Sequence, residues 1–212
     1  SDVQNRSRGI GTSQFSIAKF STNDVTMTGY NFKSLGVERG DRLDVSLNQK
    51  INALSAANEK ISNIVLDFSL NDLDSESIEK LGEIISNASE KFENWTDDDK
   101  TNAIASVRKI IDKGFKMSVP KLSAEYGKGS ITGSMIFEVL KAEPNATAFD
   151  VTKSVRASGE LLGNGKLLDQ SQKAMVIMFG IAKETKDGLK ASFDFNMASV
   201  KRNSLIQVPV LK

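Results

Sequence analysis

The acidic stretch "DLDSESIEKLGE", from Asp72 to Glu83, has the residue types that could hold a calcium ion. Its acids fall at positions 1, 3, 5 and 12 of the calcium-loop template. Position 6, where that loop requires glycine, is Ser77, and the apolar residues that follow keep the spacing of an amphipathic helix. We therefore interpret the acids as helix N-caps, with Asp72 and Asp74 as candidates, and predict no metal site here.

Two further stretches match a binding motif only in part. "TDDDK" at 96–100 places its acids side by side rather than on alternate residues, which favours a helix N-terminus over a calcium loop. "GELLGNGKLL" at 159–168 lacks the glycine spacing of a phosphate-binding loop, and Leu167 stands where that loop needs Ser or Thr. We interpret it as a loop whose glycines allow unusual backbone conformations, and we predict that it binds no cofactor.

The residue types that usually perform catalysis are missing. The chain has no histidine and no cysteine, which excludes a Ser-His-Asp triad, a thiol nucleophile, a zinc-thiolate site and disulfides. Carboxylate pairs could drive glycoside hydrolysis, but among 27 Asp and Glu residues no pair stands out. We therefore predict no catalytic, cofactor-binding or metal-binding residues. The expectation is therefore a non-catalytic protein, and the alternative to it is a carboxylate-dependent hydrolase that acts on an envelope glycan.

Charge and hydropathy argue against two further classes of protein. The chain has 28 Lys and Arg against 27 Asp and Glu, so its net charge is +1. A protein that neutralises nucleic-acid phosphates normally carries a basic excess, so we expect no nucleic-acid partner. The longest apolar run, "AMVIMFGIA" at 174–182, is about half as long as a membrane span.

Alternating apolar and polar residues predict strands over much of the chain. In "NIVLDFSL" at 63–70, Ile64, Leu66, Phe68 and Leu70 share one face. Similar alternation indicates a half-buried antiparallel sheet that includes residues 13–20, 23–32, 42–49, 115–126, 130–140 and 189–198. Pro120 interrupts one of these strands and suits an edge or a bulge.

Apolar residues at helical spacing predict a helical hairpin over about 75–113 that covers the apolar face of the sheet. Its second helix begins at Thr96 and is capped by Gly114. The apolar stripes of the two helices contain Ile78, Leu81, Ile85, Ala88 and Phe92, and then Ile104, Val107 and Ile111.

A further helix is predicted over about 171–186, and because it is apolar on nearly every side at its centre we expect it to be buried. Residues 148–170 are ambiguous, with a short helix around Val151, Val155 and Leu162 as one interpretation. The fold class that follows is α+β, with the helical hairpin and the buried helix packed on a curved antiparallel sheet. We expect residues 1–212 to form a single domain.

Three segments resemble the C-terminal part of the YdgA-like family, bacterial envelope proteins of unknown function. The first, "IVLDFSLNDLDSESIEKL", is similar to that family's strand running into a helix. The second, "IIDKGFKMSVPKLSAEYGKGSITGSMIFEV", resembles its P-x-L strand and glycine turn through Pro120, Leu122, Gly129 and Gly133. The third is the closing "LKASFDFNMASVKRNSLIQVP". The resemblance spans roughly 30–210 and implies a periplasmic body, an inner-membrane anchor or signal upstream, and no catalytic residues to carry over.

These observations lead to one functional expectation. We expect a non-catalytic periplasmic protein of a Gram-negative bacterium, part of a longer envelope protein and tethered to the inner membrane by a segment upstream. The absence of cysteine and a start without Met agree with that location. The expected ligand is an unknown envelope protein or a lipid-like amphiphile, held against the apolar side of the sheet, and a homodimer is one expected assembly.

Overall fold

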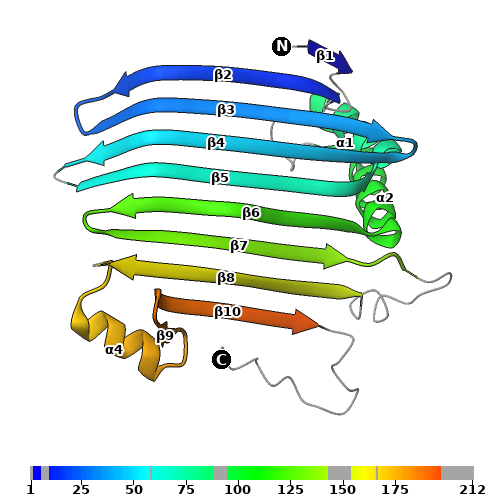
Figure 1. The fold of residues 1–212 in the computed structure, drawn as a ribbon. Coiled ribbons are helices and arrows are strands. Elements are labelled where there is room, and N and C mark those ends of the chain that lie inside the picture. Colours follow the sequence, from blue (N-terminus) through cyan, green and yellow to red (C-terminus); the bar gives the residue numbers. More distant parts are fainter. Residues whose placement is uncertain are drawn as a thin grey trace.

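The computed structural model describes residues 2–5, 10–57, 59–87, 95–142, 154–165 and 167–196. Its main feature is an open antiparallel sheet whose strands lie side by side in chain order, except that β10 lies between β8 and β9 (Figure 1). The strands are β1 (Asp2–Asn5), β2 (Ile10–Ser21), β3 (Val25–Arg39), β4 (Arg42–Ala56), β5 (Glu59–Asp74), β6 (Phe115–Tyr126), β7 (Gly129–Val139), β8 (Val155–Gly165), β9 (Lys183–Thr185) and β10 (Gly188–Asn196). The predicted antiparallel sheet is therefore confirmed.

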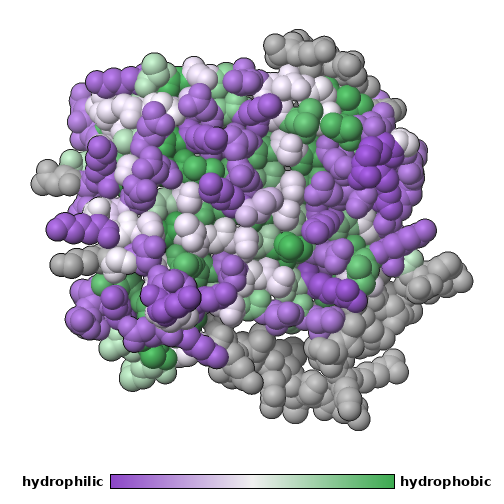
Figure 2. Space-filling model, viewed as in Figure 1, coloured by the Kyte–Doolittle hydropathy of each residue, from purple (hydrophilic) through white to green (hydrophobic). Residues whose placement is uncertain are grey.

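The two faces of the sheet differ in chemistry, because directly paired residues lie on the same face. One row of paired residues is mostly apolar and runs Phe15, Phe32, Gln49, Leu66, Leu122, Gly133, Leu161 and Ala191. The neighbouring row on the opposite face is polar and runs Gln14, Lys33, Asn48, Asp67 and Lys121. We name these the apolar face and the polar face. Hydrophilic residues cover much of the surface over the strands in Figure 2.

The break at Pro120 is a bulge, as the sequence suggested. Asp67 of β5 pairs with Lys121, but Ser69 pairs with Ser118, so one residue of β5 faces two of β6. The pairing of β6 with β7 also shifts between Val119 and Leu122. Proline has no N–H to donate to a ladder, and the bulge removes the need for one.

Two helices follow β5, namely α1 (Ser75–Asn87) and α2 (Asp97–Lys113). They contact each other and β5, and lie at one end of the sheet (Figure 1). The stretch between them, which would close the predicted hairpin and includes Ala88 and Phe92, lies outside the described residues. Within the described part of the chain, no helix is long and apolar enough to cross a membrane.

The ends of α2 are where the sequence predicted them. Thr96 Oγ1 accepts a hydrogen bond from the Asp99 N–H at 3.1 Å, and Asp99 Oδ2 accepts one from the Thr96 N–H at 3.1 Å. The three consecutive acids of "TDDDK" thus belong to the first turn of a helix. Gly114 ends the helix with a φ of 74° and donates its N–H to the Ile111 carbonyl.

The buried core is small and lies where the two helices meet the sheet. Its buried apolar members are Leu43 of β4, Leu73 of β5 and Ile110 of α2. Partly buried residues pack around them, namely Ile10, Val45, Leu70, Ile78, Leu81 and Phe115. The core positions predicted at Leu70, Ile78 and Leu81 are confirmed. Away from this corner the apolar face has exposed side chains such as Phe15 and Phe193, so the expectation that the hairpin covers that face is wrong.

The predicted apolar stripe of α2 is wrong at two of its three residues, while the third, Ile111, is half-buried. Ile104 is 67% exposed and Val107 is exposed too, whereas Ser106 and Ile110 are buried. Ser106 and Ile110 lie one turn apart, so they share the helix face that meets the core. In α1, Ile85 is likewise exposed, because the core contacts end near Leu81.

The C-terminal helix differs most from prediction. The helix α4 (Gln170–Met178) ends well before residue 186, and β9 occupies Lys183–Thr185. None of its residues is buried, so the prediction of a buried helix over 171–186 is wrong. Its apolar composition does not imply burial, because in the described residues the sheet has no second layer that would enclose it.

The ambiguous stretch before α4 is a strand. Residues 155–165 form β8, and Val155 pairs with Val139 while Leu162 pairs with Thr132. The short helix around Val155 and Leu162 is therefore wrong, and Val151 lies outside the described residues. Its alternate glycines, Gly159 and Gly163, hide the period-two pattern in the sequence.

Candidate functional site

The junction of β5 and α1 is built around a buried carboxylate. Asp74 is the last residue of β5, and its side chain is 0% exposed. Its Oδ2 accepts hydrogen bonds from the Ser77 N–H, at 3.1 Å, and from the Ser77 hydroxyl. Asp74 is thus the N-cap of α1, while the other candidate, Asp72, is exposed and pairs with Arg39.

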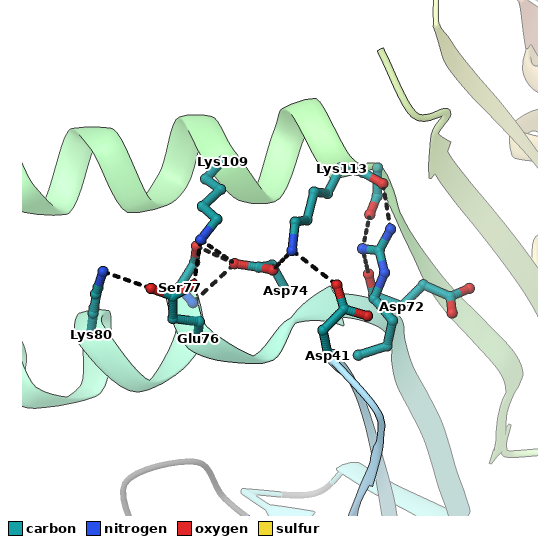
Figure 3. A network of polar contacts seen from close by, with 10 residues as sticks. Asp41, Asp72, Asp74, Glu76, Ser77, Lys80, Lys109 and Lys113 are labelled. Atoms are coloured by element: carbon teal, nitrogen blue, oxygen red, sulfur yellow. Dashed lines mark hydrogen bonds and ion pairs between the residues drawn. The ribbon is translucent and has the colours of Figure 1, made fainter. Parts of the chain in front are cut away.

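Lysines of α2 surround this carboxylate (Figure 3). The Lys113 ammonium donates to Asp74 and, at 3.0 Å, to Asp41. The Lys109 ammonium lies 3.7 Å from Asp74 Oδ2 and donates to Glu76. Glu76 in turn accepts from Lys80 at 2.9 Å. The network therefore joins the end of β5 and the start of α1 to the last turns of α2.

The charges in this network are fixed at neutral pH. Burial would raise the pKa of Asp74, but hydrogen bonds from Lys113 and Ser77 lower that pKa to about 2. Hydrogen bonds from Lys109 and Lys80 lower the pKa of Glu76 to about 2. A hydrogen bond to Asp74, followed by one to Asp41, raises the pKa of Lys113.

This arrangement fits a structural clamp and not a catalytic group. A carboxylate with a pKa of about 2 is a weak base for the Ser77 hydroxyl, and a lysine whose pKa is raised stays protonated. Three of the four acids of the partial calcium motif, Asp72, Asp74 and Glu76, are paired with cations instead of converging on one point. Within the described residues no group of three or more Asp or Glu side chains could hold a metal ion.

Arg42, on β4, completes the corner at the C-terminus of α2. Its Nη2 donates to the Lys113 carbonyl at 2.8 Å, and its Nη1 donates to the Gly114 carbonyl at 3.3 Å and the Asp72 carbonyl at 2.7 Å. The last carbonyls of a helix have no partner within the helix and carry partial negative charge, so a guanidinium both satisfies and stabilises them.

A second site, an apolar groove, lies at the opposite end of the sheet. It consists of two adjoining hollows of about 360 and 280 Å³ that share Leu161, Ile181 and Ala191. Leu161 and Ala191 belong to the apolar face, and α4 contributes Lys173 and Val176. Pockets for small ligands have volumes of about 300–1,000 Å³ and mainly apolar walls.

Glycines on β7 and β8 let the large side chains around this groove pack closely against the strands. An added Cβ at Gly133 would lie 2.8 Å from Leu161 Cδ1, and one at Gly159 would lie 2.7 Å from Cε1 of the Phe193 ring. A Cβ at Gly163 would lie 3.2 Å from Leu167 Cδ1. Large apolar side chains therefore lie directly over strand backbone at these glycines, where a side chain would leave them no room.

The charged residues of the larger hollow are one lysine and one glutamate. Lys173, on α4, lines it together with Val176, three positions further along the helix. Glu184, on β9, lines the same hollow. Neither side chain forms an ion pair within the described part of the chain. A cation and a carboxylate beside an apolar hollow can meet the polar part of a ligand whose apolar part fills the groove.

Sequence reasoning missed most of these residues. Nothing local marks Arg42, Lys109 or Lys113, because their partners are 30 or more positions away in the chain. The groove did leave a signal in "GELLGNGKLL", where Gly159, Leu161 and Gly163 alternate as they would on one face of a strand.

The comparisons with known proteins point to a family and not to an activity. Residues 1–203 match the family described as bacterial protein of unknown function, DUF945. A search of curated proteins found no match, and neither did a search of solved structures. The match covers every described strand of the sheet and all three described helices. The chain therefore belongs to the DUF945 family of bacterial proteins of unknown function.

Proposed function

We propose that this protein is a non-catalytic binding protein of the bacterial cell envelope, and that its ligand is an amphiphile with an acyl chain. The observation that carries the proposal is the groove beside α4, which combines apolar walls with the charged side chains of Lys173 and Glu184. An acyl chain is narrow and flexible enough to lie along adjoining hollows.

The charges favour an amphiphile over a purely apolar ligand. Lys173 would meet a phosphate or carboxylate of the headgroup, and Glu184 would meet an amine or hydroxyl. A hydrocarbon alone would leave both charges beside an apolar surface with no partner. A protein segment is the other expected occupant, and it would have to present a comparable apolar strip.

A binding role also agrees with the state of the polar network. Its carboxylates have pKa values of about 2 and lie against lysines, so neither Asp74 nor Glu76 is suited to act as the general acid of a glycosidase. The network contributes to stability by holding two helices on the sheet. This supports a function carried by the groove.

The proposed place of action is the periplasm, with a tether to the inner membrane, as in the YdgA-like family. The support is the resemblance of the β5–α1 and β6–β7 segments to that family and the absence of cysteine. Fusing the native N-terminal segment of the gene product to a reporter that is active only after export tests this location. A reporter that remains inactive would contradict it.

To test for the ligand, the protein is purified from the bacterial envelope and any bound lipid is then extracted from it with an organic solvent. Mass spectrometry of an organic extract should find phospholipid or free fatty acid bound at up to one molecule per chain. After delipidation, a lysophospholipid added below its micelle concentration should rebind with the same stoichiometry. Neither co-purified lipid nor rebinding would contradict the proposal, and capture of a single envelope protein instead would favour the protein-segment alternative.

A further inference from the structure

The helix α4 places a lysine against the groove and leaves larger apolar side chains exposed. Lys173 lines the larger hollow and is half-buried, whereas Met175 and Met178 of the same helix are exposed. In an ordinary surface helix the charged side chains are the exposed ones. Lys173 also forms no ion pair within the described residues. A charge beside an apolar surface is unfavourable without a partner, so Lys173 is placed to meet an anionic group of a ligand.

Glu184 carries the opposite charge, and the register of the sheet fixes the face on which it lies. It pairs directly with Leu189 of β10, which lines the larger hollow as Glu184 does. Leu189 is two positions from Ala191, so both lie on the apolar face, and Glu184 lies there with them. The lysine beside it in the chain, Lys183, pairs with Lys190 and therefore lies on the polar face. The charge of Lys183 is thus directed away from the groove.

The two charges of the larger hollow do not neutralise each other. Lys173 and Glu184 line the same hollow, but they form no ion pair with each other or with any other described residue. A ligand with only an anionic group would bind Lys173 and be repelled by the Glu184 carboxylate, and a cationic ligand would meet the converse. A headgroup with both charges gives each side chain a charge-assisted hydrogen bond.

The smaller hollow offers no such charge. Within the described residues, the charged residue that lines it is Glu160, whose carboxylate lies 2.7 Å from the Lys190 ammonium. The rest of its wall is mainly apolar and includes Val119, Leu122 and Phe193. A ligand with a charged end and an apolar end would therefore place its charges in the larger hollow and its apolar part in the smaller one.

We propose that the groove selects amphiphiles with a zwitterionic headgroup, whose anionic group binds Lys173 and whose ammonium group binds Glu184, with the acyl chain directed into the smaller hollow. The inference rests on the proposed function and narrows its ligand class. A fatty acid or a purely anionic lipid would leave Glu184 without a partner.

The test is titration calorimetry with two lysophospholipids that share one acyl chain, each kept below its micelle concentration. Lysophosphatidylethanolamine has a phosphate and an ammonium, whereas lysophosphatidylglycerol has a phosphate and hydroxyls. The wild-type protein should bind the ethanolamine lipid at least about fivefold more tightly. Glu184→Gln should bring the two affinities together. Equal wild-type affinities, or a preference that survives Glu184→Gln, overturns the proposal.

Lys173→Gln tests the other half of the headgroup. Both lipids carry the phosphate, so this variant should bind both of them more weakly and still prefer the ethanolamine lipid. Unchanged affinities in Lys173→Gln would overturn the assignment of Lys173 to the anionic group.

Lys183→Gln is the matched control, because it removes the same charge from the polar face. It should leave both affinities unchanged, and a loss equal to that of Lys173→Gln would show a net-charge effect and overturn the proposal. All three variants should keep the melting temperature of the wild type, since none of these side chains forms an ion pair within the described residues.

The direction of the chain is tested with a lysophosphatidylethanolamine that carries a nitroxide near its terminal methyl group. Met135 lines the smaller hollow and Ala182 lines the larger one. The nitroxide should broaden the methyl resonance of Met135 more than that of Ala182, and the reverse order would overturn the proposed direction.

The two lipids also separate this inference from the proposed function. Equal binding of both by the wild type contradicts selection of a zwitterion and leaves the groove as a binding site for amphiphiles. Binding of neither contradicts the proposed function, and the inference falls with it.

Discussion

Asp74 and Lys113, which are 39 positions apart in the chain, form an ion pair that closes the corner between the sheet and its two helices. Asp74 ends β5 and caps α1, and Lys113 is the last residue of α2. The carboxylate is 0% exposed, and the ammonium also reaches Asp41. One contact thus ties together a strand end, a helix start and a helix end.

Replacing Asp74 should be costly. Asp74→Asn keeps the shape of the side chain but leaves the Lys113 ammonium without its buried partner, so we expect a loss of about 3 kcal/mol in the free energy of unfolding. Urea denaturation measures this loss. Asp72→Asn is the control, because the Asp72 side chain is 56% exposed, and it should change stability by no more than about 0.5 kcal/mol. Equal losses at both positions would contradict the assignment of Asp74 as the buried cap.

The same carboxylate predicts an acid-sensitive stability. The pKa of Asp74 is about 2 in the folded protein, below its ordinary value of 3.8, so the unfolded chain takes up the proton first as the pH falls. The contribution of Asp74 is fully present above pH ~4 and is lost between pH ~4 and pH ~2, by about 2 kcal/mol.

Comparison with Asp74→Asn isolates this contribution from the other acids of the chain. The difference in unfolding free energy between wild type and variant should be constant from pH 7 to about 5 and should shrink as the pH falls towards 2. A difference that stays constant down to pH 2 would show that Asp74 is not the titrating group.

Arg42 should stabilise the protein through its hydrogen bonds to carbonyls at the C-terminus of α2. Arg42→Met removes three hydrogen bonds to main-chain carbonyls, two of them partly buried, and should cost about 2 kcal/mol. Arg42→Lys should rescue little, because one ammonium lacks the forked geometry that reaches carbonyls on separate segments. Hydrogen exchange should quicken at the last turn of α2 in both variants. Full protection there in Arg42→Met would contradict this role.

Gly114 and Gly127 allow a test of crowding at two turns with positive φ. Both have positive φ, 74° and 58°, but an added Cβ at Gly114 would lie 2.6 Å from the Val139 carbonyl oxygen, whereas Gly127 has open space. Gly127→Ala should cost ~1 kcal/mol from the left-handed backbone alone. Gly114→Ala should cost at least ~2 kcal/mol more, because backbone atoms must move. Thermal unfolding of the two variants compares them, and similar losses would contradict the close approach at Gly114.

Local patterns in the sequence predicted the elements that depend on neighbouring residues. The strand of 63–70, the caps at Asp74, Thr96 and Gly114, and the bulge at Pro120 are set by side chains within a few positions of one another. Each of these has a local physical cause, such as a short polar side chain at an N-cap or a missing N–H in a ladder.

Features that depend on distant partners could not be predicted in the same way. The inward face of α2 is chosen by contact with Leu43 and Leu73, so Ile110 is buried while Ile104 is exposed. The apolar composition of α4 suggested that the helix is buried. Its burial depends, however, on whether other elements cover that part of the sheet. Glycine in β8 concealed a strand, and the same glycines give Phe193 and Leu167 room to pack against that strand.

The claim that the groove beside α4 holds the ligand is tested most directly by a large side chain that fills the groove from a strand position. Ala191 lines both hollows, so Ala191→Phe should block them, while Thr132→Phe adds the same ring at an exposed position of the polar face. Titration calorimetry with a lysophospholipid below its micelle concentration should show binding by the wild type and by Thr132→Phe. Binding by Ala191→Phe should be weakened by at least about tenfold. Equal binding by all three proteins, with unchanged melting temperatures, would contradict the proposal that the groove beside α4 holds the ligand.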